Sequence, residues 1–166
     1  GFLSNQDSHD RQTTKNWAVF AHGVFHVNDQ VDVTAGVRYT DDKKTARIQR
    51  FNYPGFGVAV DAPVVVETTE WSPTIGVDYK VTPDVLVYAK TGKGFRSGGQ
   101  NLRATSSTAF VAFKPEEAVD YEVGLKSEWL DRRVRFNLAI YQTNVTDIQR
   151  TTIVVDPASG ANTTIA

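Results

Sequence analysis

The residues of this chain that could carry out chemistry are its histidines and carboxylates, and their spacing decides what they can do. His22 and His26 are four residues apart in a stretch with the alternation of a β-strand. At a rise of about 3.3 Å per residue they would lie ~13 Å apart, too far to share a metal ion. His26 is instead positioned to pair with Asp32 across a tight turn. The sequence therefore predicts no metal site here.

The carboxylates also lack a catalytic arrangement. Four of them gather in one stretch: Glu116, Glu117, Asp120 and Glu122. General acid–base catalysis needs a partner at a set distance across a cleft, and the sequence identifies none. There is no Ser-His-Asp order, no nucleophile elbow and no cysteine. We therefore expect neither an enzyme nor a bound cofactor.

A glycine-rich run could indicate a nucleotide site, but its context argues against one. Gly92-x-Gly94-x-x-Ser97 falls short of the G-x-G-x-x-G pattern, and no helix or parallel βαβ unit surrounds it. The 166 residues include 18 basic and 19 acidic side chains, a balance that argues against nucleic-acid binding. No apolar run approaches the roughly 18 residues of a membrane helix, which leaves a membrane barrel open. The chain begins at Gly1 and has no methionine, so we expect a piece of a longer protein.

The dominant pattern along the chain is an alternation of apolar and polar residues, typical of strands with two different faces. In VDVTAGVRYT the apolar positions are Val31, Val33, Ala35, Val37 and Tyr39. In VDYEVGLKSEWL they are Val119, Tyr121, Val123, Leu125 and Trp129, and in VRFNLAIYQTN they are Val134, Phe136, Leu138 and Ile140. Apolar residues do not recur at helical spacing. We expect an all-β, antiparallel fold.

The connections between strands alternate between short and long. The short ones are the polar turns Asn28 to Gln30, Thr82 to Asp84 and Asp131-Arg132. The long ones are about 41–66, 97–115 and 156–161, and the charged runs DSHD at 7–10 and DDKK at 41–44 are expected to be solvated loops. Consecutive connections of an up-and-down sheet fall at opposite ends. One end then has only short turns and the other only long loops, as in outer-membrane barrels.

The three short turns also test the assignment of faces, because a slip of one residue would exchange them. The first turn sets Val27 across from Val31 and Phe25 from Val33. The second sets Val81 across from Val85 and Tyr79 from Val87. The third sets Trp129 across from Val134, Leu125 from Leu138 and Glu128 from Arg135. All three keep apolar residues opposite apolar ones.

Strand length and aromatic spacing both fit a membrane. The periodic segments run about 10 to 15 residues, longer than the usual 5 to 6 of soluble proteins and sufficient for a bilayer. Trp17 and Phe25, Trp71 and Tyr79, and Tyr121 and Trp129 each lie eight apart on one face. On tilted strands that spacing spans about 21 Å, close to the apolar band between two aromatic girdles.

The number of strands predicts an incomplete barrel. We count about six full strands and the start of a seventh at NTTIA. A bacterial barrel has at least eight strands, in even number. This chain therefore cannot close by itself.

Several motifs in order resemble those of TonB-dependent outer-membrane receptors. They are YAKTGKGFRSGG, FKPEEAVDYEVGLKSEWLDRRVRFNLAIYQTNVTDIQ, and AVF followed by VDVTAGVRYTDDKK, together covering roughly residues 15 to 155. In that family a Gly-Phe-Arg/Lys-Ser/Pro-Gly-Gly run is followed by Pro-Glu, Tyr-Glu-x-Gly and Asp-Ile-Gln. The chain departs from the pattern at Gln100, where an aromatic is common, and at Lys90 and Gly92 in a strand usually richer in Ser and Tyr.

The resemblance implies an up-and-down transmembrane β-barrel, of which residues 1–166 would be part. The complete barrel would have 22 strands, with a plug domain and C-terminal strands outside this chain. Such a protein lies in the bacterial outer membrane and imports a scarce solute, most often an iron–siderophore complex. Its partners would be the lipid bilayer, the iron chelate and a TonB-type energy-coupling protein that acts through the plug. Position and polarity suggest Arg96, Gln100 and Arg103 as ligand contacts.

The glycines of the RSGG run then have an expected purpose. Gly98 and Gly99 would permit positive φ where a strand leaves the sheet and becomes an outer loop. Gly94 would weaken side-chain packing where the barrel wall meets its interior.

Other readings of the pattern remain open. A soluble sandwich or adhesin-like protein would pack Val31, Val37, Val123 and Ile140 against a second sheet. A receptor of the same family could carry cobalamin or a carbohydrate instead of an iron chelate. A barrel enzyme such as a protease or lipase would need a catalytic set that is not visible here.

Overall fold

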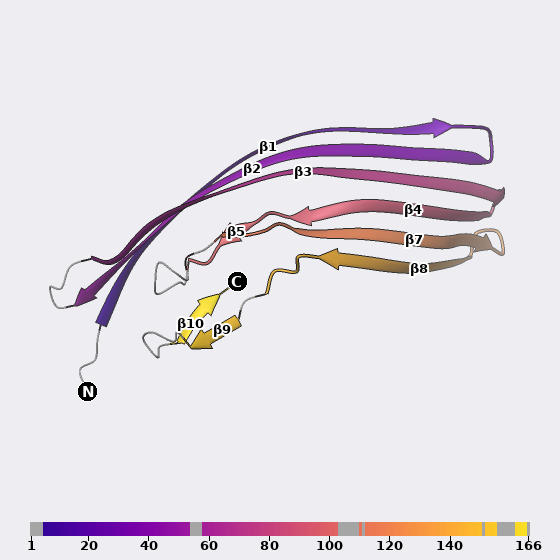
Figure 1. Cartoon of the computed structure of the whole chain (residues 1–166). Helices are drawn as coiled ribbons and strands as arrows, with labels where there is room; N and C mark the ends of the chain where they lie inside the picture. The colour runs from indigo at the N-terminus through magenta and orange to yellow at the C-terminus, as the bar shows by residue number, and fades with distance from the viewer. Residues whose placement is uncertain are drawn as a thin grey trace.

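The chain forms one long, curved antiparallel sheet with strands of very different length (Figure 1). It is described from a computed structural model, for residues 5–53, 58–102, 110, 112–150, 152–155 and 162–165. The six strands of the sheet are β1 (Asn5–His26), β2 (Val31–Tyr53), β3 (Val58–Thr82), β4 (Val85–Arg96), β7 (Glu116–Trp129) and β8 (Val134–Thr146). They lie side by side in the order β1-β2-β3-β4-β7-β8. No helix in these ranges could span a membrane.

Two short hairpins accompany the sheet. β5 (Gly99–Gln100) pairs with β6 (Ala112–Phe113), and both lie in the segment of the chain that connects β4 to β7. β9 (Thr152–Val155) pairs with β10 (Asn162–Ile165). The NTTIA segment is therefore one strand of a separate hairpin, and the prediction that it starts a seventh strand of the main sheet is wrong. Residues 156–161 lie outside the described ranges.

The short turns all lie at one end of the sheet, and the predicted registers hold with one exception. Phe25 pairs with Val33 and Leu125 with Leu138. At the second turn Tyr79 pairs with Val87, but Thr82 takes the place opposite Val85 because the register shifts between Lys80 and Thr82. The shift is a β-bulge, which sequence alternation cannot locate.

Local chemistry explains two of these turns. The Asn28 side-chain oxygen accepts hydrogen bonds from the backbone N–H of Gln30 (2.9 Å) and Val31 (2.8 Å), as an Asx turn does. In the third turn Asp131 and Arg132 have φ of 53° and 67°. Leu130 also has positive φ (55°), and the N–H of Arg133 donates to the Leu130 carbonyl at 3.1 Å, so three left-handed residues reverse the chain here.

The other end of the sheet differs from the prediction. β1, β2 and β3 have 22, 23 and 25 residues, so most of the stretch 41–66, expected to be a loop, is strand. The charged runs at 7–10 and 41–44 also lie within β1 and β2, not in loops. The longer strands continue beyond the ends of β4, β7 and β8, as Figure 1 shows. Alternation continues through this extension, and a separate segment buries one of its faces, as described below.

The sheet has two faces with different exposure. Val37, Val123 and Ile140 are 39%, 54% and 66% exposed on the face that carries the apolar residues. No second sheet in the described ranges covers them, contrary to the sandwich alternative. The small apolar core lies on the opposite face of the extension and consists of Ala46, Ile48 and Phe110. We call the apolar side the outward face and the other the inner face.

Candidate functional site

The inner face of the sheet is lined by polar side chains that bond to one another. The Asp32 carboxylate contacts the His26 ring, as predicted, with 2.6 Å between Oδ1 and Nδ1. The Lys80 ammonium lies 3.2 Å from the other oxygen of the same carboxylate. Farther along, the Thr143 hydroxyl donates to Asp120 at 2.7 Å. A hollow of about 350 Å³ lies on this face, next to Thr74, Lys90 and Asp120 among others. Within the described ranges no cluster of three or more His, Asp or Glu could hold a metal.

One part of this inner wall explains the Tyr-Glu-x-Gly motif. Tyr88 on β4 lies directly opposite Gly124 on β7. A Cβ atom at Gly124 would lie 2.4 Å from the tyrosine ring. The ring therefore covers the glycine, and its hydroxyl donates to Glu122 at 2.6 Å while Lys90 lies 3.1 Å from the same carboxylate. Only glycine leaves room for this arrangement.

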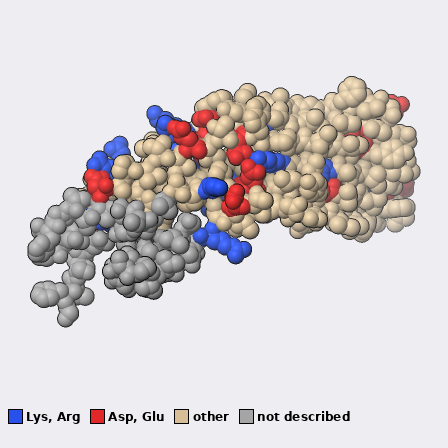
Figure 2. All heavy atoms as spheres, viewed as in Figure 1, with Lys and Arg blue, Asp and Glu red and all other residues tan. Residues whose placement is uncertain are grey.

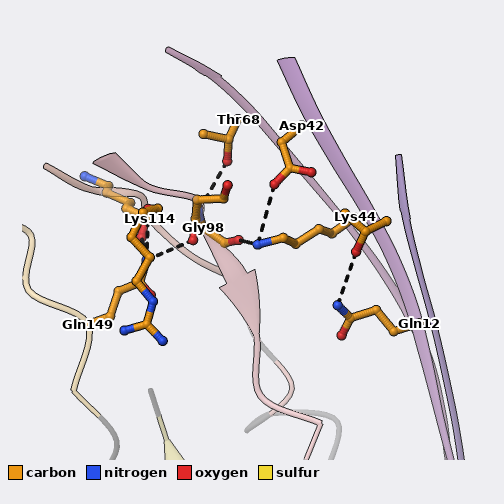
Figure 3. Close-up of polar contacts among 10 residues, drawn as sticks. Gln12, Asp42, Lys44, Thr68, Gly98, Lys114 and Gln149 are labelled. Carbon is orange, nitrogen blue, oxygen red and sulfur yellow. Dashed lines mark hydrogen bonds and ion pairs between the residues drawn. The ribbon is translucent and has the colours of Figure 1, made fainter. Parts of the chain in front are cut away.

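The segment after β4 folds back onto the inner face of the β2–β3 extension (Figure 3). The Lys44 ammonium donates to the carbonyl of Gly98 at 2.7 Å, and the N–H of Gly98 donates to the Thr68 hydroxyl at 3.3 Å. Thr68 itself is buried. Two strands of the extension thus hold one residue of this segment. We call the described part of the segment, residues 97–102, 110 and 112–114, the strap.

The glycines of the strap are needed for close approach. Neither Gly98 nor Gly99 has φ in the left-handed range, so the expectation of a left-handed backbone is wrong. A Cβ at Gly98 would lie 2.6 Å from the Phe113 carbonyl oxygen, and one at Gly99 would lie 2.8 Å from the Phe113 ring. The outgoing and returning arms of the strap are too close for a side chain. At Gly94 a Cβ would meet nothing within 4 Å.

Farther along the strap a buried arginine makes a second attachment. Arg50 is 5% exposed, forms an ion pair with Asp10 on β1 and donates to the carbonyl of Leu102 at 2.7 Å. Leu102 also packs against the core of Ala46, Ile48 and Phe110. The strap is therefore fixed to β2 and β3 by hydrogen bonds and apolar contact.

Both ends of the strap meet at a single glutamine beyond β8. The side-chain nitrogen of Gln149 donates to the carbonyls of Ser97 (3.1 Å) and Lys114 (3.0 Å), and lies 3.4 Å from that of Arg96. Its backbone N–H donates to Glu116 at 2.8 Å. Figure 3 shows this junction beside the Gly98 contacts. Gln149 closes the base of the strap.

Comparison with known proteins decides what this architecture is. The family model described as "TonB dependent receptor-like, beta-barrel" matches residues 1–166. The chain belongs to the TonB-dependent receptor family. It is 24% identical over 141 residues to the pesticin receptor of Yersinia pestis, covering 82% of this chain and 20% of that protein. It is 34% identical over 89 residues to the metal-pseudopaline receptor CntO of Pseudomonas aeruginosa, covering 53% of this chain and 11% of that protein.

A solved structure supports the same fold. The crystal structure of the ferric yersiniabactin uptake receptor FyuA from Yersinia pestis matches with a TM-score of 0.77 at 22% identity, covering 87% of this chain and 22% of that one. The predicted fold class is confirmed: the chain is an open part of an outer-membrane β-barrel. TonB-dependent receptors are not enzymes, which confirms the prediction of no enzymatic activity. The chain spans only about a fifth of the length of the pesticin receptor and of FyuA, and 11% of the length of CntO.

Membership of the TonB-dependent receptor family indicates which end of the sheet faces the periplasm and which end faces the outside of the cell. In outer-membrane barrels short turns face the periplasm and long connections face the outside. The extension of β1–β3 and the strap therefore lie at the outer mouth of the barrel. The inner face, with its polar wall, faces the lumen.

The predicted ligand contacts lie in different surroundings. Arg96 is exposed at the outer end of β4. Gln100 is 8% exposed on β5, and neither polar atom of its side-chain amide has a hydrogen-bond partner among the residues that the structure describes. Arg103 lies outside the described residues. The sequence analysis assigned no role in the site to Lys44 or Thr68. Gln149 was noted only as the last residue of the Asp-Ile-Gln motif.

Proposed function

We propose that the parent protein is an outer-membrane receptor that imports a ferric siderophore or a similar metal chelate. The observation that carries this proposal is the strap, which is held at the mouth of the lumen on a wall that extends beyond the membrane. Solute captured outside would meet this surface before it reached the lumen. The names of the relatives, a metal-pseudopaline receptor and a ferric yersiniabactin uptake receptor among them, support a metal chelate as cargo.

Residues 1–166 act in this proposal as one part of the barrel domain. The plug domain and the remaining strands belong to the rest of the parent. Energy for import comes from a TonB-type protein in the periplasm that acts on the plug, as the family name indicates. The polar inner face, with Asp120 and Glu122, suits a wet lumen filled by such a plug.

Arg96, Gln100 and Arg103 contact the chelate in this proposal. The exposed guanidinium of Arg96 can donate several hydrogen bonds to carboxylate or phenolate oxygens. Gln100 has a buried amide without a partner in the described part of the chain, and an unpaired buried polar group costs about 1–3 kcal/mol. Contact with a chelate after the strap moves would satisfy it.

Uptake by whole cells tests the proposal. The full-length parent would be expressed in a Gram-negative strain that lacks its own siderophore receptors, with and without a functional TonB. We expect accumulation of radioactive iron from at least one ferric siderophore, only when both TonB and the parent are present. Uptake that does not need TonB would contradict the mechanism. Uptake of cobalamin or a carbohydrate, with none of iron chelates, would contradict the choice of cargo.

A further inference from the structure

The inner face of the extension holds the outgoing arm of the strap through its backbone. The Lys44 ammonium donates to the carbonyl of Gly98 at 2.7 Å, and the N–H of Gly98 donates to the Thr68 hydroxyl at 3.3 Å (Figure 3). Four residues later, the Arg50 guanidinium donates to the carbonyl of Leu102 at 2.7 Å. Every amino acid has this carbonyl, and every one except proline has this N–H. These bonds therefore do not depend on the side chains of the strap.

An apolar floor lies between the two cations. The inner positions of β2 between Lys44 and Arg50 include Ala46 and Ile48, which are 1% and 0% exposed. Leu102 of the strap packs against this floor. Backbone groups for affinity and apolar ground for side chains are the elements with which proteins bind extended peptides. We call the following residues the peptide seat: Lys44, Ala46, Ile48 and Arg50 on β2, and Thr68 on β3.

The strap fits the peptide seat imperfectly. Within the described ranges β5 pairs only with β6, so no ladder of backbone hydrogen bonds joins the strap to β2 or β3. Gln100 is 8% exposed, and its amide has no partner among the described residues. Asp42, beside Lys44, is 6% exposed and has one oxygen without a partner in the same ranges. Because buried polar groups without partners are unfavourable, both weaken the docked state of the strap.

The peptide seat lies outside the membrane, where a dissolved peptide can reach it. Figure 2 shows that most charged side chains in view lie toward the extended strands. Since charged side chains are costly in hydrocarbon, this half of the sheet lies in water. A peptide outside the cell therefore meets the extension directly, and the strap is its competitor for the seat.

We propose that the peptide seat binds an extended peptide from outside the cell, and that the strap occupies the seat in the absence of this ligand. The peptide gives a carbonyl to Lys44, an N–H to Thr68 and, four residues later, a second carbonyl to Arg50. An apolar residue in the place of Gln100 improves the fit, because no amide is then buried without a partner. Strap and ligand exclude each other, so the measured affinity scales with the fraction of receptors whose strap is open. The inference does not rest on which solute is imported.

Peptide binding to the full-length parent in detergent tests the peptide seat. The probe is a fluorescent hexapeptide, SGGFNL, which copies residues 97–102 with phenylalanine in the place of Gln100. Fluorescence anisotropy gives its affinity. In Gln149→Met the base of the strap loses two hydrogen bonds, so the open fraction, and with it the affinity, should rise about 5- to 30-fold. Gln142→Met removes a bond elsewhere and should bind the probe as the native protein does.

Position 100 provides a second test, because one exchange has opposite effects in the two chains. Changing the probe from SGGQNL to SGGFNL should strengthen its binding to the native receptor about fivefold or more, since a buried amide without a partner is removed. Gln100→Phe in the receptor removes the same amide from the strap. It should weaken binding of the unchanged SGGFNL probe by a similar factor, because the strap then holds the seat more firmly.

Several results would overturn the proposal. They are the absence of SGGFNL binding in every variant, equal affinity in the native protein and Gln149→Met, and effects of the same sign for the two exchanges at position 100. A probe with the same six residues in scrambled order misplaces the phenylalanine and leucine, and equal binding of this probe would also count against the seat. A benzophenone in the place of the leucine should label β2 near Ala46 and Ile48 on illumination. Labelling confined to other segments would contradict the assignment.

Discussion

Replacing Gln149 by methionine should loosen the base of the strap. The change keeps the length of the side chain and removes the nitrogen that donates to the carbonyls of Ser97 and Lys114. A net hydrogen bond contributes about 1 kcal/mol, and these two are partly exposed. We therefore expect the free energy of opening the strap to fall by about 1–2 kcal/mol, which raises the open population about 5- to 30-fold.

Hydrogen exchange of backbone amides measures this opening directly. The N–H of Gly98 is the reporter, since it donates to Thr68 only while the strap is docked. Its exchange should quicken by the same factor in Gln149→Met of the full-length parent. Gln142→Met is the matched control, because that side chain donates to Asn144 on the same strand and not to the strap. Unchanged exchange at Gly98 would refute the role given to Gln149.

Two further predictions concern packing and charge. Gly124→Ala should displace the Tyr88 ring and reduce the free energy of unfolding by about 1–3 kcal/mol in a denaturant titration. Gly94→Ala is the control and should leave the free energy of unfolding nearly unchanged. Equal effects of the two substitutions would contradict the packing argument. The Arg47 guanidinium lowers the pKa of Asp61 below the usual 3.8, so their interaction stabilises the extension above that pH and is lost as the pH falls through the lowered value. In Arg47→Gln the carboxyl titration, followed by NMR, should move up toward 3.8, and an unchanged midpoint would show that the pair does not form.

The strands inside the membrane could be predicted from the sequence because one rule governs them. Alternation assigns the faces, and each short turn then fixes the register, as Phe25 with Val33 and Leu125 with Leu138 show. The bulge at the second turn could not be predicted, because the extra residue leaves the apolar–polar alternation of the sequence intact. Local patterns were therefore sufficient for the wall but not for its irregularities.

The mouth of the barrel could not be predicted because its contacts are distant in sequence. Asp42 and Arg50 look like loop charges, yet both are buried. Their burial depends on the strap, about fifty residues later in the chain, as the bond from Arg50 to Leu102 shows. Gly98 was recognised as necessary for the wrong reason, since backbone crowding by Phe113 is invisible in a single sequence.

The central claim is that the two faces of the sheet meet different solvents, and accessibility of spin labels tests it most directly. Labels at Val123 and Leu138 on the outward face would be compared with labels at Glu122 and Asn137, their neighbours on the inner face. In the full-length parent in lipid bilayers, we predict that oxygen dissolved in lipid relaxes the first two labels strongly and the second two weakly. Equal oxygen access at all four sites, or protection of Val123 and Leu138 from lipid, would contradict the account.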